Sequence, residues 1–152
     1  MGRMVAVISD GMGTGGRAAV DGSMASSIIA KLIKAGLGFD CALKVVNSAL
    51  MVKSGDESLA TLDVLSFDMF TGGIELMKAG APMTFIRKGG KVFSIESPSL
   101  PVGILPNVEF SYSTEALLPG DIVVMLSDGA VATGEDLSLI HISEPTRHLR
   151  IS

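Results

Sequence analysis

The chain has 152 residues, of which 47% are hydrophobic, and a formal net charge of −4. Its length suits one domain with its own core, and its composition excludes a disordered or low-complexity protein. The acidic balance argues against nucleic-acid binding, and no apolar run approaches the roughly 18 residues of a membrane helix, so we expect no membrane contact from this segment.

The first part of the chain predicts one strand followed by two helices. Residues 4–9 form a short apolar run that is typical of a buried strand. One amphipathic helix is predicted by apolar residues at helical spacing, namely Ala25, Ile28, Ile29, Leu32 and Ile33. Two glycines within residues 35–38 end this helix. We expect Asp40 to cap a second helix, whose stripe is Leu43, Val46, Asn47, Leu50 and Met51.

The rest of the chain predicts a meander of strands, because the hydrophobic period changes to two. The expected strands cover residues 62–70, 74–78, 83–87, 91–95, 108–113 and 121–127. In the first of them Leu62 and Val64 break the alternation, which indicates a bulge or burial on both faces. The pair Gly89-Gly90 predicts a tight hairpin. Strand, two helices and then a meander predict an α+β fold with antiparallel sheet.

Two Asp-Gly pairs, Asp10-Gly11 and Asp128-Gly129, each come directly after an apolar strand. A carboxylate at the end of a strand is held by the sheet, and the glycine beside it lets the backbone approach an ion and offer a carbonyl ligand. Asp-Gly is also a common turn pair, so for either pair alone a plain turn is the favoured interpretation. The repeated Ser-Asp-Gly favours a shared site.

The residue types available for metal binding favour a hard cation. Both histidines lie within residues 138–152, and Cys41 is the one cysteine of the chain. A metal site upstream must therefore rely on carboxylate and carbonyl oxygens, which favours Mg²⁺ or Mn²⁺ over zinc. A lone cysteine also forms no internal disulfide, which fits a reducing cytoplasm.

A dinucleotide-binding fold is an alternative interpretation of the first glycine cluster. Gly11, Gly13 and Gly16 match G-x-G-x-x-G after a strand and before a helix. However, Asp10 would repel a pyrophosphate, and a second helix follows where a parallel strand is required. Rossmann-type nucleotide binding therefore remains a minor alternative.

Five short motifs occur in order along the chain: Ser-Asp-Gly-Met-Gly at 9–13, Ala-Thr-Leu-Asp at 60–63, Lys-Ala-Gly-Ala-Pro at 78–82, Leu-Pro-Val-Gly-Ile at 100–104 and Leu-Ser-Asp-Gly at 126–129. With Gly-Arg-Ala at 16–18 and the two helices, this set resembles the phosphatase domain of the stage II sporulation protein E family. That family lies within the PPM, or protein phosphatase 2C, superfamily. The resemblance runs from about residue 4 to residue 137.

This resemblance implies a fold and a chemistry. The fold would be an α-β-β-α sandwich, with two antiparallel sheets flanked by helices. Asp10 would bridge two Mn²⁺ or Mg²⁺ ions, the Gly11 carbonyl would complete one shell, and Asp128 would bind the second ion. Asp10 and Asp128 would then be catalytic through the bound metals, in hydrolysis of phosphoserine without a covalent enzyme intermediate.

The resemblance also implies a biological setting. The substrate would be a phosphorylated anti-anti-sigma factor of sporulation signalling, and the segment would be a cytoplasmic domain of a membrane-anchored parent. A homodimer is left open. A phosphatase-like module that docks a partner protein without catalysis is the alternative function.

Two elements of the family pattern do not match this sequence. They are an acidic strand pair before Met4 and a final Asp segment after Asp128. Residues 138–152 instead resemble translated sequencing adapter, although an ordinary chain end is the alternative. We therefore interpret residues 1–137 as a partial, incomplete phosphatase domain with little activity of its own, and residues 138–152 as a non-native tail.

Several other residues are expected to be structural. We expect Asp63 to form a hydrogen bond near its strand, and Asp56 and Asp68 to lie in solvent. For Arg17 we favour a solvated charge or a salt bridge over a contact with phosphate near the helix start. The methionines at 24, 51, 69, 77 and 125 are expected to fill the core.

Overall fold

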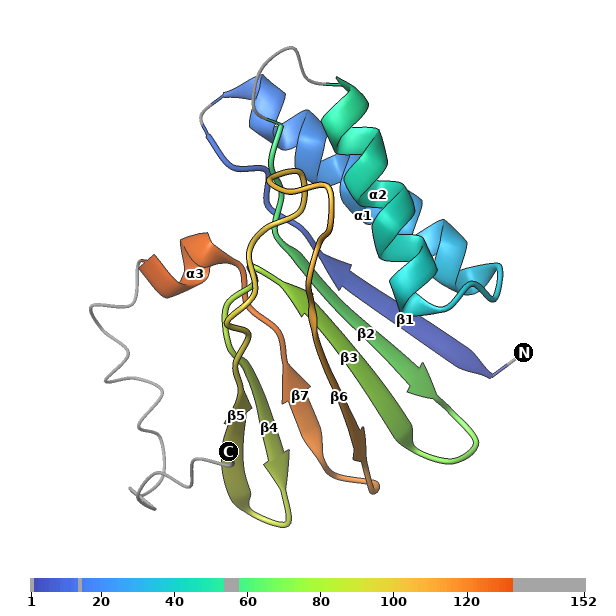
Figure 1. Cartoon of the computed structure of the whole chain (residues 1–152). Coiled ribbons are helices and arrows are strands. Elements are labelled where there is room, and N and C mark those ends of the chain that lie inside the picture. The colour runs from blue at the N-terminus through green and yellow to red at the C-terminus, as the bar shows by residue number, and fades with distance from the viewer. Residues whose placement is uncertain (1, 14, 54–57, 133–152) are drawn as a thin grey trace.

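The computed structural model describes residues 2–13, 15–53 and 58–132, and it contains two sheets and three helices in that part of the chain (Figure 1). The elements in chain order are β1 (Arg3–Ile8), α1 (Gly16–Lys34), α2 (Phe39–Lys53), β2 (Leu62–Asp68), β3 (Gly73–Ala79), β4 (Thr84–Lys88), β5 (Lys91–Ile95), β6 (Ser111–Ala116), β7 (Ile122–Val124) and α3 (Asp128–Ala132). Asp56 and the predicted tail at 138–152 lie outside the described residues.

The two sheets pack face to face. The first has the strand order β1-β2-β3-β6 and the second has the order β5-β4-β7, with antiparallel pairing throughout. Helices α1 and α2 lie side by side over one face of the first sheet (Figure 1). Its other face packs against β4 of the second sheet. The predicted α+β sandwich with antiparallel sheets is confirmed, and in the described residues the long helices cover the first sheet.

Strand β2 is the centre of this arrangement because it is buried on both faces. Leu62 and Val64 pack under the helices, whereas Leu65 points between the sheets. The pairing of β2 with β3 runs without interruption from Leu62 to Phe67, so the break in alternation reflects two-sided burial and not a bulge.

The β4–β5 hairpin confirms the prediction from two adjacent glycines. Gly89 and Gly90 join strands that pair from Lys88 with Lys91 outward. Both glycines have positive φ, at +54° and +81°, as the two central residues of a type I′ turn require.

Three local predictions were wrong. Asp40 lies inside the first turn of α2, where its carboxylate bonds Lys44, because the helix already begins at Phe39. The predicted strand at 108–113 pairs only from Ser111, since the residues before it pack on the helix-side core outside the ladder. Met69 is 65% exposed at the β2–β3 turn and not in the core.

Other predictions about side chains hold. Met77 is fully buried, Met24 and Met125 pack on the two core clusters, and Asp68 lies at an exposed turn. None of the helices in the described part of the chain combines the length and the apolar character of a membrane span.

The helix-side core predicts a clear contrast between two positions on the helices. Ile29 of α1 is fully buried, whereas Val52 of α2 is 87% exposed. Ile29→Ala should lower the free energy of unfolding by about 2–5 kcal/mol, because it removes buried methyl groups and leaves a cavity. Val52→Ala should change it by less than about 0.5 kcal/mol. Urea unfolding followed by circular dichroism measures both, and equal losses would contradict this assignment of the core.

Candidate metal centre

The backbone of Asp10 is held by a continuation of the β1–β2 ladder. Ile8 lies opposite Asp63, and the same register brings Asp10 opposite Thr61. The Asp10 N–H donates to Thr61 Oγ1 at 3.1 Å, and the Thr61 N–H donates to the Asp10 carbonyl at 2.8 Å. A bridge between Gly11 and Ala60 extends the pairing by one residue. Asp10 therefore projects from a rigid strand end, as predicted.

Helix α1 presses directly on the Asp10 loop. A Cβ added at Gly11 would lie 1.7 Å from the carbonyl oxygen of Ala18, and one at Gly22 would lie 2.8 Å from the Gly11 nitrogen. Two glycines face each other, and no larger residue fits at either position without moving the helix or the loop. On the other side of the loop, the Met12 N–H donates to the Leu59 carbonyl at 2.8 Å. The close approach fixes the Gly11 peptide in place.

Asp128 lies at the end of the second sheet. It is the first residue of α3, a helix of five residues that follows β7. Ser127 begins this turn, since its carbonyl accepts the N–H of Ala130 at 3.0 Å. The carboxylate of Asp128 is exposed. Unlike Gly11, Gly129 has open space around its Cα, so steric crowding does not require a glycine there.

The strand connections bring the end of β1 and the start of α3 to the same end of the sandwich (Figure 1). The segments that carry Asp10 and Asp128 lie there with them. From the Asp10 end the chain runs away in β2 and returns in β3. It enters the second sheet there at Thr84, the first residue of β4. Because β7 is antiparallel to β4, with Phe85 opposite Val124, the segment after β7 that carries Asp128 lies at this end too.

The donors at this end fit a hard divalent cation in type but are few in number. They are two carboxylates, on different sheets, and the carbonyl oxygen of the enclosed Gly11. Within the described residues no cation forms a salt bridge with Asp10 or Asp128, and no group of three acidic, His or Cys side chains is close enough to hold a metal. Oxygen ligands on rigid strand ends suit Mg²⁺ or Mn²⁺.

A buried ionic network lies just below the Asp10 end. Lys78 Nζ donates to Asp63 Oδ2 at 2.5 Å and to Thr84 Oγ1 at 2.7 Å, and Thr84 Oγ1 donates to Asp63 Oδ2 at 3.1 Å. None of the three residues is more than 1% exposed. The expected hydrogen bond of Asp63 is confirmed. Lys78 and Thr84 were not predicted as its partners from the sequence, although a lysine inside an apolar strand is itself a signal of a buried anion.

Burial dominates the electrostatics of this network. It raises the pKa of Asp63 and lowers the pKa of Lys78, while the ion pair between them acts in the opposite direction on both. Both directions mean that the folded state disfavours the two charges. In addition, Asp63 Oδ1 is buried without a hydrogen-bond partner among the described residues. The network is therefore a costly one.

A second ionic contact clamps α1 to α2. Lys53 Nζ donates to the carboxylate of Asp21, which is 3% exposed and also bonds Ser58. This ion pair is the main reason why the pKa of Asp21 lies below its ordinary value of 3.8, with a smaller contribution from Arg17. Arg17 is exposed, as predicted.

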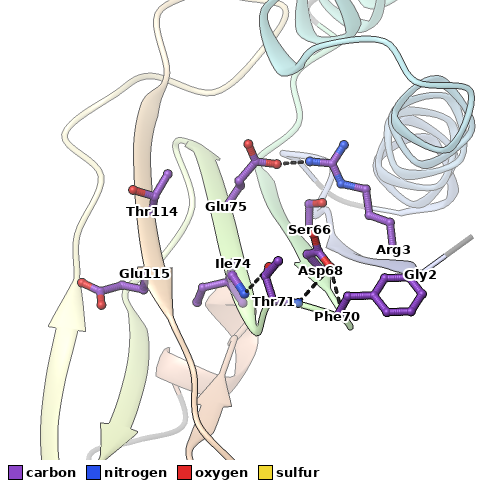
Figure 2. Close-up of a pocket in the computed structure, with 11 residues that line it drawn as sticks. Gly2, Arg3, Ser66, Asp68, Phe70, Thr71, Ile74, Glu75, Thr114 and Glu115 are labelled. Atoms are coloured by element: carbon purple, nitrogen blue, oxygen red, sulfur yellow. Dashed lines mark hydrogen bonds and ion pairs between the residues drawn. The ribbon is translucent and has the colours of Figure 1, made fainter.

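One pocket lies at the opposite end of the strands. It has a volume of about 560 Å³ and is lined by residues of β1, β2, β3, β6 and the β2–β3 turn. Figure 2 shows Arg3 and Glu75 pointing toward each other as an ion pair, and Asp68 bonding the turn that follows it. These groups bond one another. Because the pocket lies at the opposite end of the strands, it is separate from the candidate metal centre.

The family comparison covers nearly the whole chain. The family model for Stage II sporulation protein E (SpoIIE) matches residues 1–145. The chain belongs to the stage II sporulation protein E family. It is 32% identical over 127 residues to stage II sporulation protein E of Bacillus subtilis (strain 168), and 33% identical over 128 residues to that of Priestia megaterium. Each alignment covers 84% of this chain but only 15% and 22% of those relatives.

Solved structures show the same fold. The PP2C phosphatase domain, with a fragment of the regulatory domain, of the cell-fate determinant SpoIIE from Bacillus subtilis has a TM-score of 0.76 and 30% identity. The match covers 93% of this chain and 40% of that one. The RsbU and RsbW domains of a Mycobacterium tuberculosis protein have a TM-score of 0.73 and 25% identity, over 91% of this chain and 41% of that one. RsbX in complex with magnesium, at 16% identity and a TM-score of 0.71, shares the fold.

The Asp63–Lys78 pair should show strong coupling in a double-mutant cycle. Lys78→Met alone leaves a buried carboxylate without its cation and should cost about 3–5 kcal/mol of stability. Asp63→Leu combined with Lys78→Met should cost far less, because two apolar side chains are buried without the cost of removing charges from water. Urea unfolding of the two single variants, the double variant and the parent chain gives the coupling energy. Additive losses would contradict the buried ion pair.

The Asp21–Lys53 contact should make stability depend on acid. A lowered pKa means that the carboxylate stabilises the fold above its ordinary pKa, and that this contribution is lost as the pH falls through the folded-state value. Asp21→Asn should therefore lower stability at pH 7 by about 1 kcal/mol, a modest value because Lys53 is one-third exposed. The difference from the parent chain should shrink at pH 3. Urea midpoints at both pH values measure it, with the exposed Asp40→Asn as the control that should change little at either. An equal loss from Asp21→Asn at both would refute the role of this charge.

Proposed function

We propose that this chain is part of the catalytic domain of a metal-dependent protein serine/threonine phosphatase. Asp10, Gly11 and Asp128 are the proposed metal ligands, and two Mn²⁺ or Mg²⁺ ions are the proposed cofactors of the intact enzyme. The relatives support the reaction class, since one solved structure at 30% identity is described as a PP2C phosphatase domain.

One observation carries the proposal: the two Ser-Asp-Gly segments follow strands of different sheets, β1 directly and β7 after two residues, and both lie on the same side of the sandwich. A plain turn would explain either pair alone. It would not explain why Gly11 is enclosed so tightly that no Cβ fits, with its peptide held beside a half-buried carboxylate. A backbone carbonyl next to a fixed carboxylate is what an oxygen-coordinated cation uses.

The chemistry divides between the cations and the chain. Divalent ions at this site supply an activated water and neutralise charge on a phosphoryl group. The chain supplies the geometry. Thr61 fixes the peptide of Asp10, α1 fixes the peptide of Gly11, and the second sheet brings the carboxylate of Asp128 from the opposite side. No nucleophilic cysteine or histidine is needed in this arrangement.

The substrate and the setting are further proposals. A phosphoserine protein of the anti-anti-sigma class is the substrate that the sequence resemblance implies, in sporulation signalling. The solved relatives with regulatory domains support a regulatory protein as partner. We also propose that the domain is cytoplasmic within a membrane-anchored parent. A homodimer stays a prediction.

A docking module without catalysis is the second candidate. The observation that favours it is the small donor set, since the described residues contain no cluster of three metal-ligating side chains. Mn²⁺ titration separates the two, because a docking module does not need to bind metal. The small donor set also leads us to expect that the 152-residue chain by itself releases phosphate slowly at best.

The metal centre can be tested by removing each carboxylate. Calorimetric titration of the chain with Mn²⁺ should give binding that Asp10→Ala and Asp128→Ala each weaken by more than about tenfold. Unfolding midpoints should change little, because neither side chain belongs to a core cluster. Asp40→Ala, which removes an exposed carboxylate on α2, is the matched control and should bind Mn²⁺ like the parent chain.

A second readout addresses catalysis. Mn²⁺-dependent phosphate release from a phosphoserine protein should be slow for this chain. In a longer chain from the same gene that includes the flanking segments, phosphate release should be robust. The substitutions Asp10→Ala and Asp128→Ala in that longer chain should each abolish the release. Unchanged Mn²⁺ affinity in both variants would remove the metal-ligand assignment. Rapid turnover by the 152-residue chain would show that these donors suffice.

A further inference from the structure

The buried network of Asp63, Lys78 and Thr84 joins the two sheets. Asp63 and Lys78 lie opposite each other on β2 and β3 of the first sheet, and Thr84 begins β4 of the second. Their side chains meet in the space between the sheets, where each is at least 99% buried. A three-way contact of 2.5, 2.7 and 3.1 Å leaves little freedom in the spacing of the sheets at this point.

The network lies directly beneath both candidate ligands. Asp63 is two residues beyond Thr61, whose hydroxyl and N–H hold the backbone of Asp10. On the other sheet, the register of β4 with β7 places Thr84 opposite the residue that follows Val124, three residues before Asp128. On the first sheet Asp63 is therefore close along the chain to Thr61, the partner of Asp10. On the second sheet Thr84 lies opposite a residue that is close along the chain to Asp128.

A second path runs from the same lysine to the Asp10 loop. The carbonyl of Lys78 accepts the hydroxyls of Ser97 and Ser99, at 3.3 and 2.9 Å. The chain that follows reaches Val102, which exchanges two backbone hydrogen bonds with Ala60, the residue that also bridges to Gly11. Lys78 is thus connected to the proposed centre in two ways, through the hydrogen bonds of its side chain and through those of its carbonyl.

We propose that Asp63, Lys78 and Thr84 are positioning residues that set the separation of Asp10 and Asp128 and thereby the affinity of the site for metal. This inference rests on the proposed function. Stability alone does not account for the network, because it buries two charges and leaves Asp63 Oδ1 unpartnered, whereas apolar side chains would fill the space at lower cost. A metal shared between two sheets requires a fixed spacing, and directional hydrogen bonds supply it.

The molecule offers an internal comparison at its other end. Lys88 of β4 and Glu115 of β6 also pair across the two sheets, at 2.9 Å, but each side chain is about one-third exposed. This contact lies near the β4–β5 hairpin, far along the strands from Asp10. It joins the same sheets and does not adjoin the candidate ligands, so it serves as a matched control.

The test is the Mn²⁺ affinity of the 152-residue chain, measured by calorimetry with unfolding midpoints alongside. Thr84→Val keeps the shape of the side chain but removes the hydroxyl, and it should weaken Mn²⁺ binding by about 10- to 100-fold. Thr84→Ser keeps the hydroxyl and should stay within about threefold of the parent chain, as should the control Lys88→Met.

A triple variant separates positioning from stability. Asp63→Leu, Lys78→Met and Thr84→Val together make the network apolar, and the variant should unfold at a urea midpoint near that of the parent chain while binding Mn²⁺ as weakly as Thr84→Val. A stable triple variant with parental affinity would overturn the inference. So would Thr84→Val with parental affinity, or Thr84→Ser as weak as Thr84→Val. If the parent chain and Asp10→Ala both fail to bind Mn²⁺, the proposed metal centre itself is wrong and the inference falls with it.

Discussion

Helix α1 packs on the loop after β1 with no side chain between the two backbones, and the arrangement of the whole site depends on this contact. Gly11 and Gly22 make it sterically possible, because either Cβ would overlap main-chain atoms of the other segment. Helix α2 then secures α1 through the buried carboxylate of Asp21 and its ion pair with Lys53. The peptide of Gly11 is thus held by the helix pair on one side and by pairing with residues 59–60 on the other.

The face of the first sheet that packs on the second sheet is also held by residues that are not themselves candidate ligands. Strand β2 must satisfy two different environments, so Leu62 and Val64 toward the helices are apolar, whereas the side chains toward the second sheet include the charge of Asp63. Burying that charge is tolerated where Lys78 and Thr84 surround it. The apolar residues between the sheets, around Leu76 and Ile86, need no directional hydrogen bonds, and their burial provides most of the attraction between the two sheets.

How much could be predicted from the sequence depends on how far apart along the chain the interacting residues lie. Helices and most strands were predictable because hydrophobic period is a local signal, and the Gly89-Gly90 turn is set by its own φ angles. The start of β6 was not, because the local pattern does not show where a partner strand comes within reach: Phe110 packs on the helix-side core, and the pairing with β3 starts only at Ser111. Asp10 was found from its motif, whereas Lys78 was overlooked because its partners lie 15 and 6 residues away on other strands.

The two Ser-Asp-Gly motifs look alike in sequence but differ physically. The first is enclosed by a helix and a paired strand, whereas the second opens an exposed turn in which a Cβ at Gly129 would meet only Ser127 Oγ, at an ordinary contact distance of 4.0 Å. Of the two proposed ligands, Asp10 is thus preorganised, whereas Asp128 is held mainly by the position of its sheet. A cation bound by both would link β1 to β7 across the sandwich, and ligands that bind only the folded state stabilise it. Metal binding and the packing of the two sheets would then be coupled, with the Asp10 side, whose backbone is held by β2 and α1, as the more rigid part of the proposed site.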